Sequence, residues 1–260
     1  HVDGRTYARA MRTASGTPIV VELEPHGSEP FVTLRVGGVG GEPPELSGVV
    51  QATRRLFDLD ADPEAIDATL ASDHVLAPLV REEPGTRLPG ATDGFELAVR
   101  AIVGQQVSVA AARTTVGRIA ERFGDPLVSV HRTIVRLFPT PERLGTAPPG
   151  SLGMPRGRAE AVVSVARAVT RGELDLSGAA EIEPTLDAFT SIRGVGEWTA
   201  SYLAMRALHD PDAFPAGDLG LRRGAAALGL AGDPASLRER AERWRPWRAY
   251  AAMHLWNARR

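Results

Sequence analysis

The chain has 260 residues, of which 43% are hydrophobic and 24% are charged, and its formal net charge at pH 7 is −2. It contains no cysteine, which excludes disulfides, thiolate zinc sites, cysteine nucleophiles and cysteine-bound iron–sulfur clusters. It also contains no lysine, so all 30 basic residues are arginine and no side chain can form a lysine Schiff base.

The basic residues are concentrated in the later part of the chain. Residues 1–90 contain 8 arginines and 14 acidic residues, whereas residues 91–260 contain 22 arginines and 18 acidic residues. Residues 237–260 alone contain seven arginines and two glutamates. Because nucleic-acid binding depends on local charge more than on the total, we expect the basic surface of the protein in its C-terminal part.

The first sixty residues are predicted to be rich in β-structure. Residues 18–24 (PIVVELE) and 31–36 (FVTLRV) are short β-branched runs, separated by the turn-forming residues Pro25, Gly27 and Pro30. This pattern indicates two strands joined by a turn, and such a pair needs further strands or a helix to be stable.

Helical periodicity replaces this pattern along the chain. Residues 46–57 carry apolar side chains at helical spacing, and Asp62 followed by Pro63 predicts a helix start with Asp62 as the N-cap. From Ser72 onward the pattern is almost purely helical, with predicted helices at residues 95–103, 106–123 and 157–169. We therefore expect an α+β protein with a small antiparallel β-sheet at the N-terminus and a larger all-α body.

The segment 186–208 (LDAFTSIRGVGEWTASYLAMRAL) predicts a helical hairpin: a short helix at residues 186–191, a turn, and a second helix at residues 197–208. The turn is formed by Ile192, Arg193, Gly194, Val195 and Gly196. Its two glycines allow a close backbone approach, and the N–H groups that start the second helix can bind an anion such as a DNA phosphate. By itself the G-V-G turn is more typical of an ordinary helix–turn–helix corner, so its neighbours decide the interpretation.

Two features follow the hairpin turn. Trp198 and Tyr202 lie four residues apart, so they share one face of the second predicted helix, a pattern that alone is more typical of a core. Asp218 follows Gly217 and precedes a helix-like run, which is typical of a helix N-cap. An N-cap position would stabilise the ionised carboxylate, so capping and a catalytic role are compatible.

These residues carry a family resemblance. Residues 194–223 resemble the hairpin and the Gly/Pro-Asp loop of helix-hairpin-helix (HhH-GPD) DNA glycosylases, and the chain as a whole resembles the 3-methyladenine DNA glycosylase II (AlkA-like) family. Further matches follow the family order along nearly the whole chain: residues 57–60 (FDLD), 88–90 (LPG), 100–110 (RAIVGQQVSVA), 138–144 (FPTPERL), 152–155 (LGMP) and 241–256 (AERWRPWRAYAAMHLW).

The resemblance implies a domain organisation. Residues 1–69 would form a TBP-like antiparallel sheet domain, residues 93–210 a helical domain with the hairpin, and residues 70–92 and 211–260 a second helical subdomain. The active site would lie in the cleft between the helical subdomains. In this family another strand and a helix ordinarily precede the segment that resembles residues 6–12, and this sequence begins at His1, close to that segment. We therefore expect a sheet that is short of one strand and a piece of a longer protein, in which a fused upstream domain is possible.

The resemblance also assigns roles to residues. Asp218 would be the catalytic carboxylate, and Trp198, Tyr202 and Trp256 would line the pocket for the flipped base. The hairpin residues 192–196 would contact the backbone of the damaged DNA strand.

Two further roles follow from the same resemblance. The carbonyl groups of Thr190, Ile192 and Val195 would hold a sodium or potassium ion that bridges the hairpin to a DNA phosphate. Gln106 occupies the position of the wedge that fills the gap left by the flipped nucleotide, where an apolar residue is usual. Glutamine can still fill that gap and hydrogen-bond the orphaned base.

The implied function is that of a monofunctional DNA glycosylase of base excision repair. It would flip alkylated bases of the 3-methyladenine and 7-methylguanine type out of double-stranded DNA and leave an abasic site. Without lysine it would have no AP-lyase activity, and it would need neither zinc nor an iron–sulfur cluster. The sequence has no visible signal peptide and no apolar run of about 18 residues, so we expect the protein in the bacterial cytoplasm, acting at the nucleoid and not at a membrane. We also expect a monomer.

Two other functions stay open. A non-catalytic helix-hairpin-helix module would explain the hairpin and the arginines, but it gives no reason for Asp218 and the three aromatic residues. A helical interaction protein would use Trp244, Trp247 and Trp256 as core residues and would not bind DNA; for Trp244 and Trp247 we accept the core interpretation. The histidines at positions 1, 26, 74, 131, 209 and 254 form no metal-ligand pattern.

Overall fold

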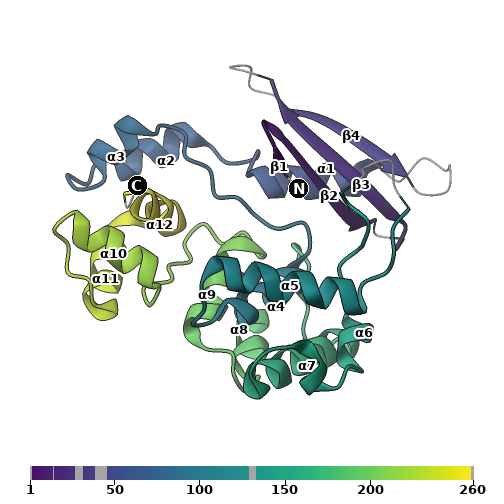
Figure 1. Cartoon of the computed structure of the whole chain (residues 1–260). Coiled ribbons are helices and arrows are strands. Elements are labelled where there is room, and N and C mark those ends of the chain that lie inside the picture. Colours follow the sequence, from purple (N-terminus) through teal and green to yellow (C-terminus); the bar gives the residue numbers. More distant parts are fainter. Residues whose placement is uncertain (1, 14, 27–31, 39–45, 129–132, 259–260) are drawn as a thin grey trace. The chain divides into compact units, whose positions relative to one another are not determined.

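The computed structural model describes residues 2–13, 15–26, 32–38, 46–128 and 133–258. The chain divides into two compact units, each built from two separate segments. The first unit comprises residues 1–52 and 103–170, and the second comprises residues 53–102 and 171–260. Figure 1 shows the strands and helices of both units by their labels. Within the described residues, no helix is long and apolar enough to cross a membrane.

The first unit contains an antiparallel β-sheet with the strand order β1-β2-β3-β4 (Figure 1). Its strands are β1 (Val2–Asp3), β2 (Thr6–Arg12), β3 (Pro18–Pro25) and β4 (Val32–Gly38). The two strands predicted at residues 18–24 and 31–36 are confirmed as β3 and β4, although Phe31 itself lies outside the described residues. Like Phe31, the starting residue His1 is not among the described residues.

Strand β3 is buried on both faces, which explains its run of β-branched residues. Ile19 and Val21 pack against Val49 of α1 (Leu46–Phe57) on one face. On the other face, Val20 packs in a cluster with the loop residue Leu127 and others. Since successive side chains of a strand point to opposite faces, this run fills two hydrophobic clusters at once.

The remaining helices of the first unit are α5, α6 and α7, with one 3-10 turn. Their bounds are α5 (Val109–Phe123), α6 (Pro141–Gly145), η1 (Pro149–Leu152) and α7 (Arg156–Thr170). The predicted start of α5 at Gln106 is wrong by three residues. Ser108 caps α5 by accepting a hydrogen bond from the Ala111 N–H at 3.2 Å, and Gln106 has a φ of 56°, which is incompatible with a helix.

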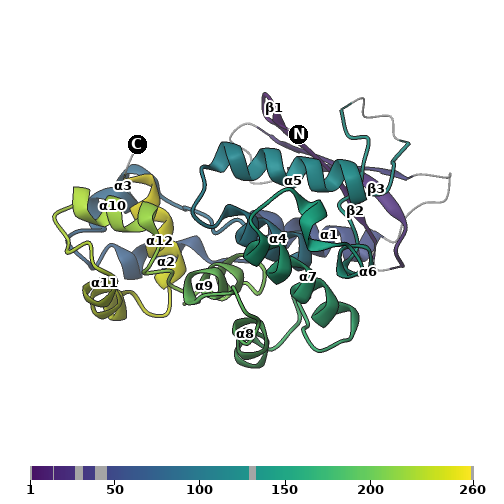
Figure 2. The ribbon, with the colours of Figure 1, turned by 60° about the horizontal axis from the view of Figure 1, so that its bottom comes forward.

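The second unit is helical, and α2, α3, α10, α11 and α12 gather around one core in Figures 1 and 2. The bounds are α2 (Pro63–Leu70), α3 (Ala77–Glu82), α8 (Ile182–Thr190), α9 (Glu197–Arg206), α10 (Leu219–Ala227), α11 (Pro234–Ala241), η2 (Glu242–Trp244) and α12 (Arg248–Asn257). Helix α4 (Gly94–Gly104) begins in this unit and ends in the first. Trp244 is fully buried in the core, as predicted, whereas Trp247 is only half-buried at its edge.

Polar contacts tie distant segments of the second unit together. The Asp58 carboxylate accepts hydrogen bonds from the Leu88 N–H and the Tyr250 hydroxyl, both at 2.9 Å. Asp73 is buried and accepts hydrogen bonds from Arg240 and from the Trp244 indole. These contacts connect α12 and η2 to the segment between α1 and α4, so the family-like stretches at residues 57–60 and 88–90 have a structural role here.

Candidate active site

The predicted hairpin is formed by α8, a turn at residues 191–196, and α9. Helix α8 begins at Ile182, four residues before the predicted start, and α9 ends at Arg206 instead of at residue 208. Gly194 has a φ of 94°, a conformation that side chains other than glycine rarely adopt. Val195 is buried between the two exposed glycines, and its N–H donates to the Ile192 carbonyl at 3.0 Å.

Helix α9 starts without a side-chain cap. Its N-cap is Gly196, which has an extended backbone and no side chain that could accept the first N–H groups. The first turn of a helix has N–H groups without intrahelical partners and carries the positive end of the helix dipole. The turn and α9 together therefore expose a backbone surface that suits an anion.

Asp218 is the N-cap of α10, as predicted. Its Oδ1 atom accepts a hydrogen bond from the Leu221 N–H at 2.8 Å, and its own N–H donates to the Pro215 carbonyl at 2.8 Å. The side chain is half-buried next to the exposed Gly217. The backbone thus fixes one carboxylate oxygen and leaves the residue accessible.

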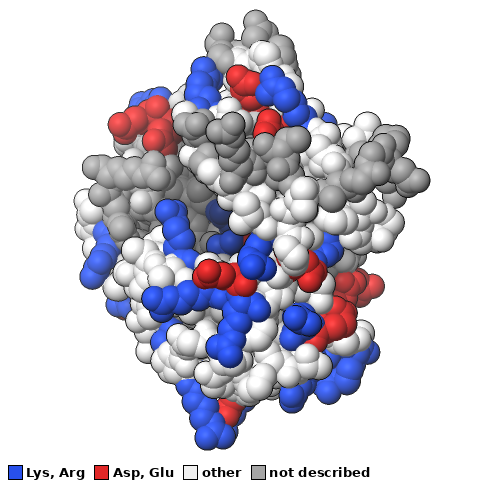
Figure 3. Space-filling view, turned by 45° about the vertical axis from the view of Figure 1, so that its right-hand side comes forward, with Lys and Arg blue, Asp and Glu red and all other residues white. Residues whose placement is uncertain are grey.

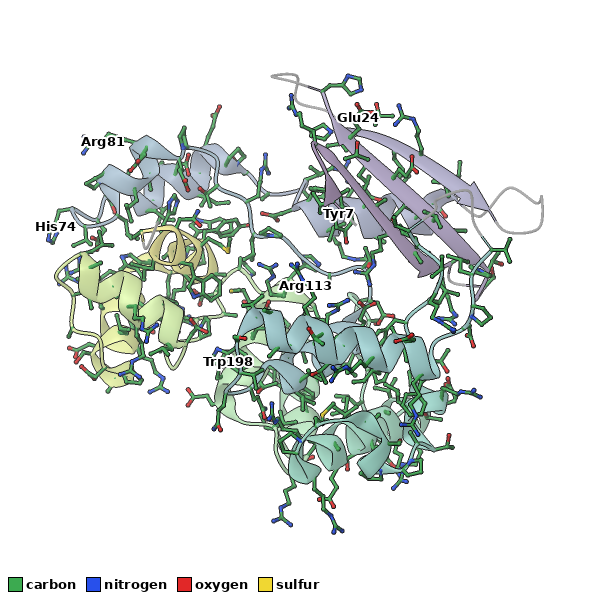
Figure 4. All side chains as sticks on the ribbon, in the orientation of Figure 1. Tyr7, Glu24, His74, Arg81, Arg113 and Trp198 are labelled. Carbon is green, nitrogen blue, oxygen red and sulfur yellow. The ribbon has the colours of Figure 1, made fainter. Side chains whose placement is uncertain are left out.

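Two tryptophans complete the hydrogen bonds of this carboxylate. The Trp198 indole N–H donates to Oδ2 of Asp218 at 2.9 Å, and the Trp256 indole N–H donates to Oδ1 at 2.8 Å. The family resemblance implied that these residues line one pocket with Asp218, but it gave no hydrogen bonds between them. Trp198, labelled in Figure 4, comes from α9, and Trp256 comes from α12. Three helices of one compact unit therefore meet at a single carboxylate.

Tyr202 stacks on Trp198, and a third residue of α9 continues the row. The two ring centroids are 5.6 Å apart with an interplanar angle of 18°. The guanidinium carbon of Arg206 lies 5.9 Å from the Tyr202 ring centroid. Arg206 was not among the site residues predicted from the sequence, although its spacing of four residues from Tyr202 was a usable signal.

Four of the five described arginines in residues 237–258 are paired with acidic residues, and the fifth, Arg243, is exposed without an ion pair among the described residues. Arg238 pairs with Glu197 at 2.5 Å, and Arg240 pairs with the buried Asp73 at 2.6 Å. Arg245 and Arg248 both pair with acidic residues of their own unit, Asp212 and Glu242. Figure 3 shows another face of the molecule, with acidic side chains among the basic ones. These arginines mainly hold the helices of the second unit together, and Arg259 and Arg260 lie outside the described residues.

Gln106 belongs to the first unit, whereas Asp218 and the hairpin belong to the second. It is exposed in the loop between α4 and α5, next to the exposed Val107 and Val109. The guanidinium group of Arg158 holds this loop by donating to the carbonyls of Val103 at 3.1 Å and Gln105 at 2.9 Å. The sequence analysis did not identify this contact.

The carbonyl groups expected to hold a cation lie in the hairpin. Thr190 is the last residue of α8, where carbonyl groups lack intrahelical partners, and the Ile192 carbonyl accepts one hydrogen bond, from Val195. A set of neutral carbonyl oxygens fits a sodium or potassium ion. Among the described residues, which leave out His1 and His131, no group of three or more His, Asp or Glu side chains is placed to hold a metal ion.

The sequence matches two protein families in succession. Residues 1–93 match the AlkA N-terminal domain, and residues 99–249 match the HhH-GPD superfamily of base excision DNA repair proteins. The DNA-3-methyladenine glycosylase 2 of Escherichia coli is 37% identical over 253 residues, which cover 96% of this chain and 84% of that protein.

Other relatives extend this result. A probable bifunctional transcriptional activator/DNA repair enzyme AlkA of Mycobacterium tuberculosis is 43% identical over 213 residues; these cover 82% of this chain but only 43% of that longer protein. The structure of a 3-methyladenine DNA glycosylase from Archaeoglobus fulgidus matches with a TM-score of 0.83 and 26% identity, covering 99% of this chain and 89% of that one. The predicted α+β fold is confirmed, and the chain belongs to the HhH-GPD superfamily of base excision DNA repair proteins.

Proposed function

We propose that this chain is a monofunctional DNA glycosylase that removes alkylated bases from double-stranded DNA, with Asp218 as its catalytic carboxylate. The observation that carries the proposal is the set of three donors on Asp218: the Leu221 N–H and the indoles of Trp198 and Trp256. An N-cap needs only the backbone donor. Two additional indole donors from separate helices orient the carboxylate and place aromatic rings beside it.

A single carboxylate is sufficient for the proposed reaction. Cleavage of an N-glycosidic bond passes through a transition state with oxocarbenium character, which a nearby negative charge stabilises. A glycosidase that releases an oxygen leaving group needs a second, acidic carboxyl group to protonate it. A base alkylated at N3 or N7 is cationic and leaves without that acid, so Asp218 can act alone on the sugar and the attacking water.

The aromatic side chains suit a cationic base. The rings of Trp198, Tyr202 and Trp256 present electron-rich surfaces near Asp218, and each cation–π contact contributes on the order of 0.5–2 kcal/mol. A flipped base is commonly held by such stacking. We infer that 3-methyladenine and 7-methylguanine are the substrate type, in keeping with the named activity of the relatives from E. coli and A. fulgidus.

The hairpin would hold the DNA backbone. Its turn at residues 192–196 and the uncapped start of α9 offer backbone N–H groups to a phosphate without a charged side chain. A sodium or potassium ion on the carbonyls of Thr190, Ile192 and Val195 would supply positive charge toward the same phosphate. Gln106 would fill the gap left by the flipped nucleotide.

The product would be an intact strand with an abasic site. Cleavage of the strand by a glycosylase/lyase proceeds through a Schiff base on an amine, and the chain has no lysine side chain to form it. The monomeric state, the bacterial cytoplasmic location and the fusion to an upstream domain stay predictions.

The test measures base release from a duplex that contains one methylated base, comparing the wild type with Asp218→Asn. Asparagine can cap α10 equally well through its Oδ1 atom, while the negative charge and the acceptor for the Trp198 indole are lost. We expect release to fall by about 100-fold or more, with unchanged binding to a duplex that contains an abasic-site analogue. The DNA strand that has lost its base should remain unbroken until it is treated with alkali.

Asp233→Asn is the matched control. Asp233 caps α11 by accepting a hydrogen bond from the Ser236 N–H at 2.9 Å, and it has no indole donor. This variant should release bases at the wild-type rate. If Asp218→Asn is equally active, or if the wild type binds DNA but releases no base, Asp218 is only a helix cap and a non-catalytic DNA-binding module is the better account.

A further inference from the structure

Tyr202 lies between two side chains of its own helix. Trp198 precedes it by four residues and Arg206 follows it by four, and residues at this spacing lie one above the other on a helix face. Their separations from the Tyr202 ring are 5.6 Å for the Trp198 ring and 5.9 Å for the Arg206 guanidinium carbon. The three side chains therefore form a continuous row, with Tyr202 in its middle.

The row of three side chains extends from a cation to the candidate catalytic carboxylate. At one end is the Arg206 guanidinium, and at the other end the Trp198 indole donates its N–H to Asp218 at 2.9 Å. This hydrogen bond requires a particular orientation of the Trp198 ring, and Tyr202 is stacked on that ring.

The charge of Arg206 is not neutralised by an ion pair within the described part of the chain. Its Nε atom is buried and has no hydrogen-bond partner there. This contrasts with Arg238, Arg240, Arg245 and Arg248, each of which pairs with an acidic residue. The charge of Arg206 also acts on His209. Burial lowers the pKa of the His209 imidazole, the charges of Arg55 and Arg206 lower it further, and the charge of Asp58 raises it.

We propose that Arg206 is a specificity-determining residue, which positions the Tyr202–Trp198 stack and whose unpaired positive charge limits the preference of the site for cationic bases. The proposal rests on the proposed function. A cationic base stacked at Trp198 would be repelled by Arg206, whereas a neutral damaged base would not be. Arg206 thereby brings the release rates of the two substrate types closer together and widens the substrate range.

The test uses the full chain and two duplexes, one with 7-methylguanine as a cationic base and one with hypoxanthine as a neutral base. Single-turnover release rates are measured for the wild type, for Arg206→Met and for Arg206→Gln. Because repulsion across a partly buried site is weakly screened, we expect both neutral variants to raise the ratio of 7-methylguanine to hypoxanthine release about three- to tenfold. Two neutral variants keep the test valid if one of them does not fold.

Two controls separate charge from packing. Arg206→Lys keeps the charge and should keep the wild-type ratio, even if looser stacking slows both reactions. Arg81→Met removes an arginine from an exposed position on α3 in the same unit and should leave both rates unchanged.

The outcomes are distinguishable. If the ratio keeps its wild-type value or falls in the neutral variants, whether or not both reactions slow, the charge of Arg206 does not set specificity and the proposal is wrong. If the wild type itself releases neither base, the proposed function fails instead.

Discussion

Gly224 of α10 and Leu255 of α12 pack backbone against backbone, so that a β-carbon on Gly224 would overlap the carbonyl group of Leu255. Helix α10 begins directly after Asp218, and Trp256 directly follows Leu255. The close approach of these two helices therefore sets the distance between the Asp218 carboxylate and the Trp256 indole that donates to it.

Gly224→Ala should consequently disturb both stability and the site. The added methyl group must push α10 away from α12, and overpacking of this kind costs about 1–3 kcal/mol. Gly117→Ala is the matched control, since Gly117 lies in α5 with open space around it; alanine there should stabilise the protein by about 0.5–1 kcal/mol. Urea denaturation and single-turnover base release measure the two effects. A Gly224→Ala variant as stable and as active as the wild type would contradict this account.

Trp256→Phe tests the indole hydrogen bond by itself. Phenylalanine keeps an aromatic ring beside Asp218 but removes the N–H that donates to Oδ1 at 2.8 Å. We expect base release to slow by about tenfold or more, because the carboxylate loses one of the donors that orient it. Trp247→Phe, at the start of the same helix, removes an indole that makes no bond to Asp218 and should have little effect on the rate. Equal rates for both variants would show that orientation by Trp256 is unimportant.

Arg158 and Gln106 should act as a pair. Arg158 fixes the carbonyls of Val103 and Gln105, so we predict that Arg158→Met weakens binding to an abasic-analogue duplex by releasing the loop that carries Gln106. Gln106→Ala should weaken the same binding by about three- to tenfold, since it shortens the exposed side chain without touching the core.

A double-mutant cycle measures this coupling. In the Gln106→Ala background, Arg158→Met should have a much smaller effect than in the wild type, because both changes act through one loop. Arg156→Met, which removes a mostly exposed arginine two residues away on α7, controls for the lost charge. Fully additive effects of Arg158 and Gln106 on binding would mean that Arg158 does not act through Gln106.

Much of the fold was predictable because local signals agreed with the tertiary packing. The runs at residues 18–24 and 46–57 became β3 and α1, and the Asp62-Pro63 signal became the start of α2. The prediction was wrong where a cap overrode periodicity: apolar spacing extended α5 back to Gln106, but the Ser108 side chain starts the helix later. Periodicity cannot distinguish the last loop residues from the first turn of a helix.

The residues of the candidate site were predictable from the sequence, but the hydrogen bonds between them were not. The family resemblance named Trp198, Tyr202, Trp256 and Asp218, which the structure brings together in one unit. The indole hydrogen bonds join residues 20 and 38 positions apart along the chain, so no local pattern encodes them. The ion pairs of Arg238, Arg240 and Arg245 were not predictable for a related reason, because a count of arginines does not reveal which of them face acidic residues from other parts of the chain.

The pH dependence of folding should be dominated near neutrality by the buried His254 and the half-buried His209. Burial lowers the pKa of His254, which is almost fully buried with an unpartnered Nε2, while the facing charges of Asp67 and Glu83 oppose that shift. Burial likewise lowers the pKa of His209. The unfolded chain therefore takes up protons below its ordinary histidine pKa of 6.5, before the folded protein does.

Stability should thus be fully present above pH 6.5 and decrease as the pH falls below it, until the folded histidines are also protonated. The slope is at most about 1.4 kcal/mol per pH unit for each proton taken up. Urea denaturation between pH 5 and pH 8 measures this slope for the wild type and for His254→Gln. The substitution lowers stability at every pH, because it disturbs the core, but it should make the curve flatter between about pH 5 and 6.5. A variant with the wild-type slope would show that His254 is protonated equally in the folded and unfolded states, in which case the burial of its ring does not control the pH response.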